Sequence, residues 1–339
     1  MVEALLIFFW ALLIAIFSIP TIINVAHTKR ILDEPNYRKV HDTEKPRLGG
    51  LAIFAGFMTS ITIFGDLSQG VQQLLAGSLV IFFVGVKDDI TDVSVFKKFF
   101  VQVLASGIVL FIADIRISSF QGLFGVYELE PGISYAFSFL VILCITNAIN
   151  LIDGLDGLAG TIVVIVSLSF GVYFFLLNDL PYAYVSFALS GAVIGFLRYN
   201  LIDARVFMGD TGSLVSGFII AILAIHFIEL NTIQSAPAIA VGILFIPIFD
   251  TLRVFAKRVY NGISPFRPDR NHAHHNLLDF GMSHLQVVIL MGVLNIVIIV
   301  FVINFTSLGN TILLLSIGAI SVFFSLALEL ITKRKHIKN

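Results

Sequence analysis

The sequence predicts an all-α polytopic membrane protein with about eleven transmembrane helices. Of its 339 residues, 58% are hydrophobic and only 13% are charged, which is more apolar sequence than a soluble domain of this length needs. Apolar runs of about 20 residues recur along the chain, and each is long enough to cross a bilayer as a helix. The charged residues gather in clusters between these runs. We therefore expect one integral membrane domain over residues 1–339, without a separate soluble domain or an internal repeat.

The predicted spans follow the apolar runs, with ends that are soft by a few residues. The first run begins almost directly after Met1-Val2-Glu3, and basic residues follow it rather than precede it. This pattern predicts a retained first helix and not a cleaved signal peptide. The spans are expected near residues 4–26, 49–65, 71–86, 98–113, 133–149, 158–177, 182–197, 213–230, 236–255, 285–304 and 309–331.

The distribution of basic residues predicts how these spans are oriented. With the spans above, every one of the 21 Lys and Arg residues except Arg116 falls on the same side of the membrane. Cytoplasmic loops of membrane proteins are enriched in Lys and Arg, so this side is expected to be cytoplasmic. The N-terminus is then outside and the C-terminus is in the cytoplasm.

The opposite side carries mostly short loops. The longest lies near residues 114–132 and contains RISSFQGLFGVYELEPG, whose alternation and central glycines predict a small extracytoplasmic β-hairpin. Cys144 is the only cysteine and lies in an apolar run, so no intrachain disulfide is expected. The unusual polar residues are concentrated on the cytoplasmic loops, where we expect the active site.

One polar stretch, NAINLIDGLDGLAGT at Asn147 to Thr161, interrupts a long apolar region. Asp153 and Asp156 are each followed by a glycine, which lets the backbone turn tightly and expose its N–H groups. Asn147 and Asn150 add amide donors and acceptors. A connecting turn needs far fewer such residues, so the stretch favours a binding site for a polar ligand.

Acidic residues mark two further cytoplasmic loops. Asp88 and Asp89 are adjacent, and Asp92 follows about one helical turn later. Acids this close repel one another unless a cation is near, and the crowding raises at least one carboxylate pKa, which suits a proton acceptor. Asp210 lies among glycines at the start of a predicted span. It is either a helix cap or a Mg²⁺ ligand.

Basic residues mark two other loops. Lys45 and Arg47 precede Gly49-Gly50, and they are either ordinary positive flanks of a span or a cradle for an anionic head group. The longest loop, near residues 256–284, contains SPFRPDRNHAHHNLLDFG. Its histidines could form a zinc site, but no cysteine is near and we favour phosphate binding by the Arg and His donors.

These groups together fit phosphoryl chemistry between a soluble phosphorylated donor and a lipid acceptor. The alternative from another class is a secondary transporter for an anionic solute. A transporter would place ionisable residues near the membrane midplane on broken helices in repeated halves. Here Asp88, Asp153 and Asp210 fall at the ends of predicted spans, and Asp250 is the one acid that would lie deeper.

These motifs, in this order, resemble the polyprenyl-phosphate N-acetylhexosamine-1-phosphate transferases of glycosyltransferase family 4. The matching segments are PRLGG, VKDD, NAINLIDGLDGLAG, FMGDTGS, PIFDTLR and SPFRPDRNHAHH, between Pro46 and His275. The HAHH pattern and the eleventh span resemble the branch that makes lipid-linked N-acetylglucosamine for teichoic acid, O-antigen or common antigen. The phospho-N-acetylmuramoyl-pentapeptide translocase branch, which usually has ten spans and three consecutive histidines, is the alternative within the family.

The resemblance implies transfer of a sugar 1-phosphate, here expected to be N-acetylglucosamine 1-phosphate, from a UDP-sugar to undecaprenyl phosphate with release of UMP. This would be the first membrane step of cell-envelope polysaccharide synthesis, in a multi-pass protein of the bacterial plasma membrane. The implied cofactor is Mg²⁺, with Mn²⁺ as a substitute. The implied partners are the UDP-sugar, the polyprenyl phosphate and the membrane, with a homodimer as a possible assembly and no nucleic acid. Transfer is either direct or proceeds through a covalent aspartyl-phosphosugar.

The resemblance also implies roles for individual residues. Asp210 would hold Mg²⁺ with Asn150, and Asp88 would deprotonate the lipid phosphate with Asp89 beside it. The residues implied in nucleotide-sugar binding are Asp153, Gly154, Leu155, Asp156, Phe207, Arg267 and Arg270. Those implied in phosphate binding are Lys45, Arg47, His272, His274 and His275. The first loop reads HDTEKPRLGG where the translocase branch has a KxGTPTMGG-like sequence, so either Lys45 or Arg47 would meet the lipid phosphate.

Overall fold

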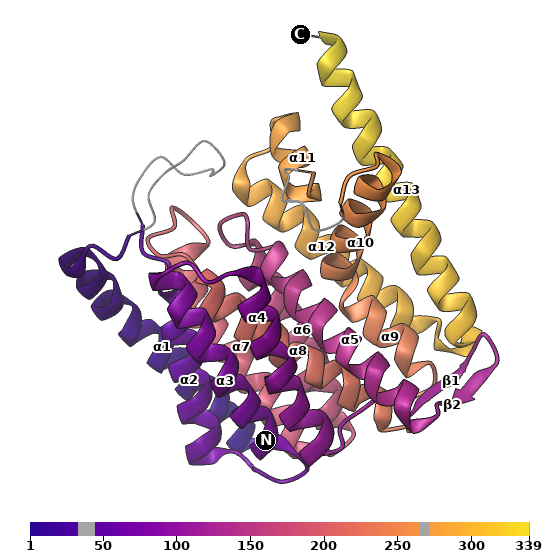
Figure 1. Ribbon diagram of the computed structural model, residues 1–339, viewed down its shortest axis with the longest axis horizontal. Helices are drawn as coiled ribbons and strands as arrows, with labels where there is room; N and C mark the ends of the chain where they lie inside the picture. The colour runs from indigo at the N-terminus through magenta and orange to yellow at the C-terminus, as the bar shows by residue number, and fades with distance from the viewer. Residues whose placement is uncertain (33–44, 265–270, 339) are drawn as a thin grey trace. The chain divides into compact units, whose positions relative to one another are not determined.

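The computed structural model describes residues 1–32, 45–264 and 271–338, with side chains up to residue 330. Its described part consists of helices and one two-stranded sheet (Figure 1). The contacts between Cα atoms divide the chain into two compact units. The first unit comprises Met1–Ser119 and Leu129–Leu230, and the second comprises Phe120–Glu128 and Asn231–Asn339.

The first unit is a helical bundle arranged around its last helix, α8. This helix packs against α2, α3, α5 and α6, and 94% of its most apolar 18-residue stretch is buried, compared with 22% for α1. The helices are α1 (Val2–Lys29), α2 (Gly49–Phe64), α3 (Val71–Ile90), α4 (Val95–Gly107) with its π-helical continuation η1 (Ile108–Ile112), α5 (Pro131–Leu151), α6 (Leu158–Leu176), α7 (Leu180–Asn200) and α8 (Gly209–Glu229).

Close helix packing positions the start of α8 against α2. A Cβ atom on Gly50 would collide with the backbone nitrogen of Gly212. Only glycine therefore allows the two backbones to approach this closely. The same region carries Asp210, so this contact fixes where the first turn of α8 lies.

The second unit contains, among its described residues, five α-helices, one short 3₁₀ helix and the hairpin apart from its first residue, Ser119. The elements are β1 (Ser119–Leu123), β2 (Val126–Glu128), α9 (Ala236–Ile243), α10 (Phe245–Tyr260), α11 (Ala273–Phe280), α12 (His284–Asn304), the short 3₁₀ helix η2 (Thr306–Leu308) and α13 (Gly309–Lys338). The predicted hairpin is confirmed. Phe124 and Gly125 at its turn have φ values of 50° and 81°, as a two-residue type I′ turn requires.

The predicted span at residues 236–255 is not one straight helix, because α9 and α10 meet at 79°. The chain leaves helical geometry at Leu244, whose ψ is 20°. The buried Asn295 of α12 accepts a hydrogen bond from the Ile246 amide and donates one to the Ile243 carbonyl, both at 3.0 Å. This side chain therefore satisfies backbone groups on both sides of the break, as an apolar environment demands.

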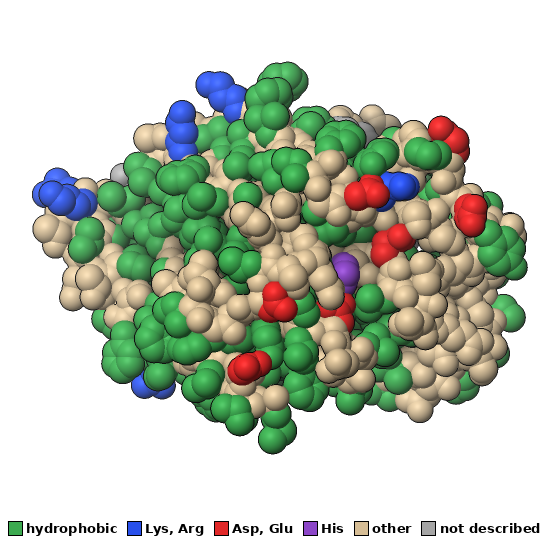
Figure 2. All heavy atoms as spheres, turned by 90° about the horizontal axis from the view of Figure 1, so that it is seen from below, with side chains coloured by type: hydrophobic (Ala, Val, Ile, Leu, Met, Phe, Trp, Pro, Cys, Tyr) green, Lys and Arg blue, Asp and Glu red, His purple; other side chains and the backbone are tan. Residues whose placement is uncertain are grey.

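The multi-pass character is confirmed. Eight helices within the described residues are long and apolar enough to cross a membrane, or nine if α9 and α10 count as one span. Helices occupy all of the predicted spans, but α2 has only 16 residues, so the count of about eleven crossings stays a prediction. Hydrophobic side chains cover much of the face seen in Figure 2, with scattered acidic side chains between them.

Candidate active site

A lysine joins two carboxylates at the ends of three helices of the first unit. Lys98, in the first turn of α4, places Nζ 2.7 Å from Asp88 Oδ2 and 2.5 Å from Asp210 Oδ2. Asp88 lies in the last turn of α3, and Asp210 lies in the first turn of α8. Between 12% and 26% of each side chain is exposed. Because this shielding strengthens the attraction between opposite charges, the lysine holds the three helix ends together.

Asn150 lies beside Asp210, the residue with which the family resemblance pairs it. Its amide nitrogen donates to Asp210 Oδ1 at 3.2 Å and to Ser213 Oγ at 2.8 Å. Asn150 belongs to the last turn of α5. The polar stretch and the FMGDTGS motif, about 60 residues apart in sequence, therefore meet at one place.

Asp89 caps the N-terminus of α8 from outside that helix. Its two carboxylate oxygens accept hydrogen bonds from the backbone amides of Asp210 at 2.8 Å and Thr211 at 3.0 Å, and from the Thr211 hydroxyl at 2.5 Å. The first amides of a helix lack partners within the helix, and a negative charge is favourable there. Gly209 has φ of 70°, and a Cβ atom on it would collide with the Arg47 carbonyl oxygen and the Asp89 carboxylate. By accepting the hydrogen bond from the Asp210 amide, Asp89 fixes the position of Asp210 at the start of α8.

The crowded acids have raised pKa values, as the sequence predicted for at least one of them. Both Asp88 and Asp89 lie beyond the apolar span predicted within α3. Burial raises the pKa of Asp89 to about 7, against the hydrogen bonds that Thr211 and Asp210 donate to it. Burial also raises the pKa of Asp88, and its contact with Asp210 acts in the same direction, whereas Lys98 opposes both. A carboxylate with a raised pKa is a better proton acceptor than an exposed one.

The PRLGG motif pairs with the FMGDTGS motif through the backbone. The Phe207 amide donates to the Pro46 carbonyl at 2.8 Å, and the Gly49 amide donates to the Phe207 carbonyl at 2.9 Å. The Lys45 ammonium lies 5.4 Å from the centre of the Phe207 ring. Lys45 and Arg47 are thereby brought to the segment that leads into Asp210.

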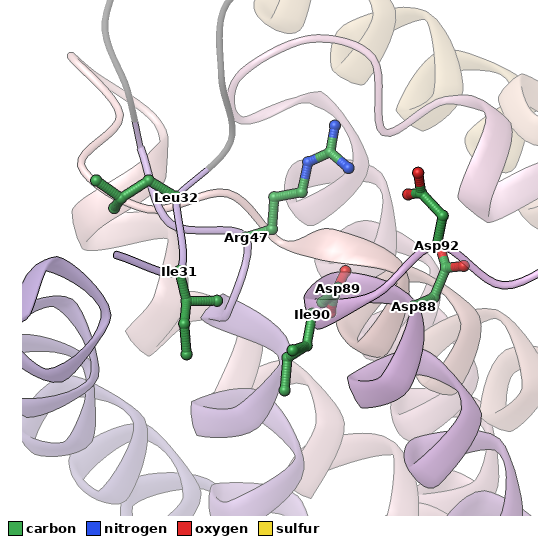
Figure 3. A pocket seen from close by; sticks show the side chains of 7 residues that line it. All are labelled: Ile31, Leu32, Arg47, Asp88, Asp89, Ile90 and Asp92. Carbon is green, nitrogen blue, oxygen red and sulfur yellow. The ribbon is translucent and has the colours of Figure 1, made fainter. Parts of the chain in front are cut away.

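A hollow of about 150 Å³ opens beside the acids (Figure 3). It is lined by Ile31, Leu32, Arg47, Asp88, Asp89, Ile90 and Asp92. Figure 3 shows the Arg47 side chain rising from the segment that precedes α2, with Asp88 at the end of α3 and Asp92 just beyond it to the right in the view. The Arg47 guanidinium can donate hydrogen bonds to a phosphate group, whereas the three carboxylates would repel an anion unless a proton or a cation lay between them.

The turn between α5 and α6 carries the acids of the polar stretch. Asp153 is half-buried, and burial raises its pKa well above the usual range, with repulsion from Asp210 and Asp89 adding to the shift. Leu155 is buried, Gly154 is exposed and Asp156 is half-buried. The repulsion on Asp153 means that the turn lies close to the acid cluster.

The histidine motif forms its own cluster in the second unit. His272 Nδ1 lies 2.7 Å from Asp250 Oδ2, and the Ala273 amide donates to Asp250 Oδ1 at 2.6 Å. His274 is 1% exposed, and burial lowers its pKa to about 3. Its ring centre is 5.6 Å from that of His272 and 4.3 Å from that of His275. Asp250, which is fully buried, therefore anchors this motif to α10.

Two predicted residues, Arg267 and Arg270, lie outside the described residues. Within the residues that the structure describes, no group of three or more His, Cys, Asp or Glu side chains could hold a metal ion. The zinc alternative for the histidine motif therefore finds no support there. Asp210 and Asn150, the pair that the resemblance implies as Mg²⁺ ligands, bring a carboxylate and an amide together, and Mg²⁺ takes such oxygen donors while keeping sites for water and substrate phosphate. In the structure Lys98 contacts the Asp210 carboxylate, and Asn150 turns its amide nitrogen toward it.

Sequence reasoning missed the role of Lys98, which it counted only as a basic loop residue. It also missed Gln102, which is 2% exposed and accepts a hydrogen bond from the Asn147 amide at 2.8 Å. The two residues are four positions apart in an apolar helix, so they lie on one face. Polar residues with this spacing in an apolar helix were the available signal.

Fold and site together define a polytopic membrane protein with a buried acidic centre at its helix ends. Residues 71–228 match the family described as Glycosyl transferase family 4. A Bacillus subtilis (strain 168) protein named as a probable undecaprenyl-phosphate N-acetylglucosaminyl 1-phosphate transferase is 34% identical over 86% of this chain and 82% of its own length. Two proteins named undecaprenyl-phosphate alpha-N-acetylglucosaminyl 1-phosphate transferase, from Salmonella typhi and Escherichia coli (strain K12), are 32% and 29% identical, each over 82% of this chain and 79% of their own length.

The chain belongs to glycosyl transferase family 4. The resemblance to this family found in the motifs is thereby confirmed, and the relatives named above carry N-acetylglucosaminyl 1-phosphate transferase names.

Proposed function

We propose that this protein transfers N-acetylglucosamine 1-phosphate from UDP-N-acetylglucosamine to undecaprenyl phosphate and releases UMP. The observation that carries the proposal is the cluster of Asp88, Lys98, Asp210 and Asn150 in a chain whose relatives bear this activity in their names. Such a cluster combines a proton acceptor with hard oxygen donors, which is what phosphoryl transfer requires.

The acceptor lipid enters as a phosphate monoester, and Asp88 takes the proton from it. Its raised pKa makes it suited to this task. An oxygen of the lipid phosphate then bonds to the phosphorus that carries the sugar, the bond from that phosphorus to the bridging oxygen breaks, and UMP leaves with that oxygen. A direct attack needs one such displacement, whereas a covalent aspartyl-phosphosugar needs two.

Residues around the cluster would orient the substrates. Lys45 or Arg47 would bind the lipid phosphate, since both lie on the segment that pairs with residues 207–208. Asp153, Gly154, Leu155 and Asp156 would hold the uridine, with Phe207 against the uracil. His272, His274 and His275, with Arg267 and Arg270, would bind the diphosphate and the sugar of the donor.

Asp210 and Asn150 would hold Mg²⁺, with Mn²⁺ as a substitute. When bound, the ion would neutralise charge on the diphosphate as the bond to UMP breaks. Asp89 would contribute by holding the first turn of α8, and thus Asp210, in place.

We further propose that these loops face the cytoplasm of a bacterium and that the reaction begins an envelope polysaccharide. The basic residues concentrated on one side of the predicted spans support this orientation. A reporter fused at the C-terminus should then be active only in the cytoplasm, and one fused after Asn178 only outside. Identical activity at both sites would refute the orientation.

The test of function is incubation of the purified protein with undecaprenyl phosphate, Mg²⁺ and a panel of UDP-sugars, with UMP as the readout. UMP should appear with UDP-N-acetylglucosamine. Plain UDP-glucose should be rejected, because a site that hydrogen-bonds the acetamido group is left with unpaired polar atoms. Release with UDP-muramoyl-pentapeptide instead would move the protein to the translocase branch. If none of the UDP-sugars in the panel led to release of UMP, the transporter alternative would be reopened.

A further inference from the structure

A groove of about 560 Å³ runs between α3 and α4 on the first unit. All of its nine described lining residues are apolar or basic. Phe83, Phe96 and Phe100 form its aromatic wall and are 65%, 79% and 56% exposed in the isolated chain. Lys87 and Lys97 lie at one end of this lining, next to the turn that joins the two helices.

The groove lies on a different face of the two helices from the acid cluster. Lys87 lines the groove, whereas its neighbour Asp88 lines the hollow beside Arg47. In the same way Lys97 lines the groove, whereas its neighbour Lys98 contacts Asp88 and Asp210. Successive residues of an α-helix point about 100° apart, so the two lysines of the groove are turned away from the reacting groups.

The chemistry of the groove is that of an anionic amphiphile. Exposed aromatic side chains on a membrane protein are covered by acyl chains, and lysine stems extend along apolar surface so that the ammonium reaches the head-group region. A lysine near the bilayer surface attracts anionic lipid, and two of them at one groove should favour it over zwitterionic lipid about five-fold or more.

We propose that the groove between α3 and α4 binds an anionic phospholipid, with an acyl chain against Phe83, Phe96 and Phe100 and the head-group phosphate between Lys87 and Lys97. The bound phospholipid packs against the outer face of the same two helices whose inner faces carry Asp88 and Lys98. This site is separate from the one proposed for the phosphate of the acceptor lipid.

The test uses tryptophan fluorescence, because Trp10 is the only tryptophan of the chain. The full-length protein carrying Trp10→Phe and Phe96→Trp is placed in vesicles that contain brominated phosphatidylglycerol or brominated phosphatidylcholine, whose bromines quench a neighbouring indole. Quenching should favour phosphatidylglycerol about five-fold. The preference should fall close to one when Lys87→Gln and Lys97→Gln are added.

The matched control places the indole at the other end of the same helical run, with Phe111→Trp in the Trp10→Phe background. Phe111 is 63% exposed and belongs to η1, and no preference is expected there. Equal quenching by the two lipids at position 96 would overturn the proposal, as would a preference that survives both lysine substitutions. Displacement of brominated phosphatidylglycerol by a small mole fraction of undecaprenyl phosphate would also overturn it, because the groove would then belong to the acceptor lipid.

Discussion

The acid cluster of the first unit and the histidine motif of the second both bury polar side chains, but they satisfy them differently. Asp88 and Asp210 share the ammonium of Lys98, and Asn150 donates to Asp210. His274 is more deeply buried than these acids, yet neither of its ring nitrogens has a hydrogen-bond partner among the described residues.

The difference indicates two ways of preparing a site. A network whose charges are mutually paired keeps its geometry before any substrate arrives, so the acid cluster is preorganised. A buried polar group without a partner costs about 1–3 kcal/mol. Such a cost is tolerated where a polar ligand would supply the missing hydrogen bonds, and the proposed donor diphosphate could do so.

Asp210→Asn should have the largest effect and would test whether the acid cluster is the reaction centre. A neutral amide holds Mg²⁺ far less well than a carboxylate and also loses the ion pair with Lys98. Turnover, measured as UMP release, should fall about a thousand-fold, with partial rescue at most by excess Mg²⁺. Asp203→Asn is the matched control, since this exposed residue has φ of 48°, which asparagine adopts readily. Near-normal turnover in Asp210→Asn would remove the cluster from the mechanism.

Asp88→Asn should lower kcat about a hundred-fold or more, because it removes the proton acceptor. Binding of the UDP-sugar should stay measurable, because Asp88 is not among the residues proposed to bind that substrate. The readouts are steady-state kinetics and calorimetric titration with UDP-N-acetylglucosamine. Asp203→Asn, the exposed control used above, should keep normal turnover. A variant at position 88 with unchanged kcat would show that Asp88 is not the base.

Asp89→Asn should act on stability through the first turn of α8, with a loss of about 1–2 kcal/mol from the altered cap. The folded protein holds an extra proton on Asp89 between the ordinary pKa of 3.8 and the raised value of about 7. The stability contributed by this group is therefore greatest below that range and falls as pH rises through it. The Tm advantage of the unaltered protein over Asp89→Asn should narrow between pH 4 and 7, roughly. An advantage that widens over this range would contradict the assignment.

His274→Phe should have the smallest effect on the fold and would sharpen the contrast between the two regions. Phenylalanine fills the same buried space without unpaired nitrogens, so Tm should stay equal or rise slightly. The KM for the UDP-sugar should rise on the order of ten-fold, since a side chain that would donate a hydrogen bond to the diphosphate is lost. His284→Phe, at the start of α12, serves as the control for a general histidine effect. A lower Tm with an unchanged KM would mean that His274 is a structural residue.

The sequence predicted the helices and the hairpin, because each depends on a local pattern, and the family resemblance implied that Asn150 and Asp210 act together. It did not predict the break at Leu244, which is stabilised by an amide about 50 residues further on. Nor did it predict that Asp89 caps a helix that begins 120 residues later. Both contacts depend on how helices pack in three dimensions, and no local spacing reports that.

The histidine motif shows the same limit from another side. Its composition indicated anion binding, but the anchoring of His272 by Asp250 requires two helices to lie together. In the sequence, Asp250 stands out only as an acid that would lie deeper in the membrane than the others. The partner that makes its burial tolerable could be found only in the folded chain.

The central place of α8 has a consequence for how the protein is made. Ribosomes deliver the chain from its N-terminus, and α8 is the last helix of the first unit to emerge. The helices that pack against α8 are therefore synthesised before it, and so are Asp88 and Lys98, whose partner Asp210 comes only with the first turn of α8. A nascent chain that stops before residue 209 would carry the helices that flank α8 without Asp210.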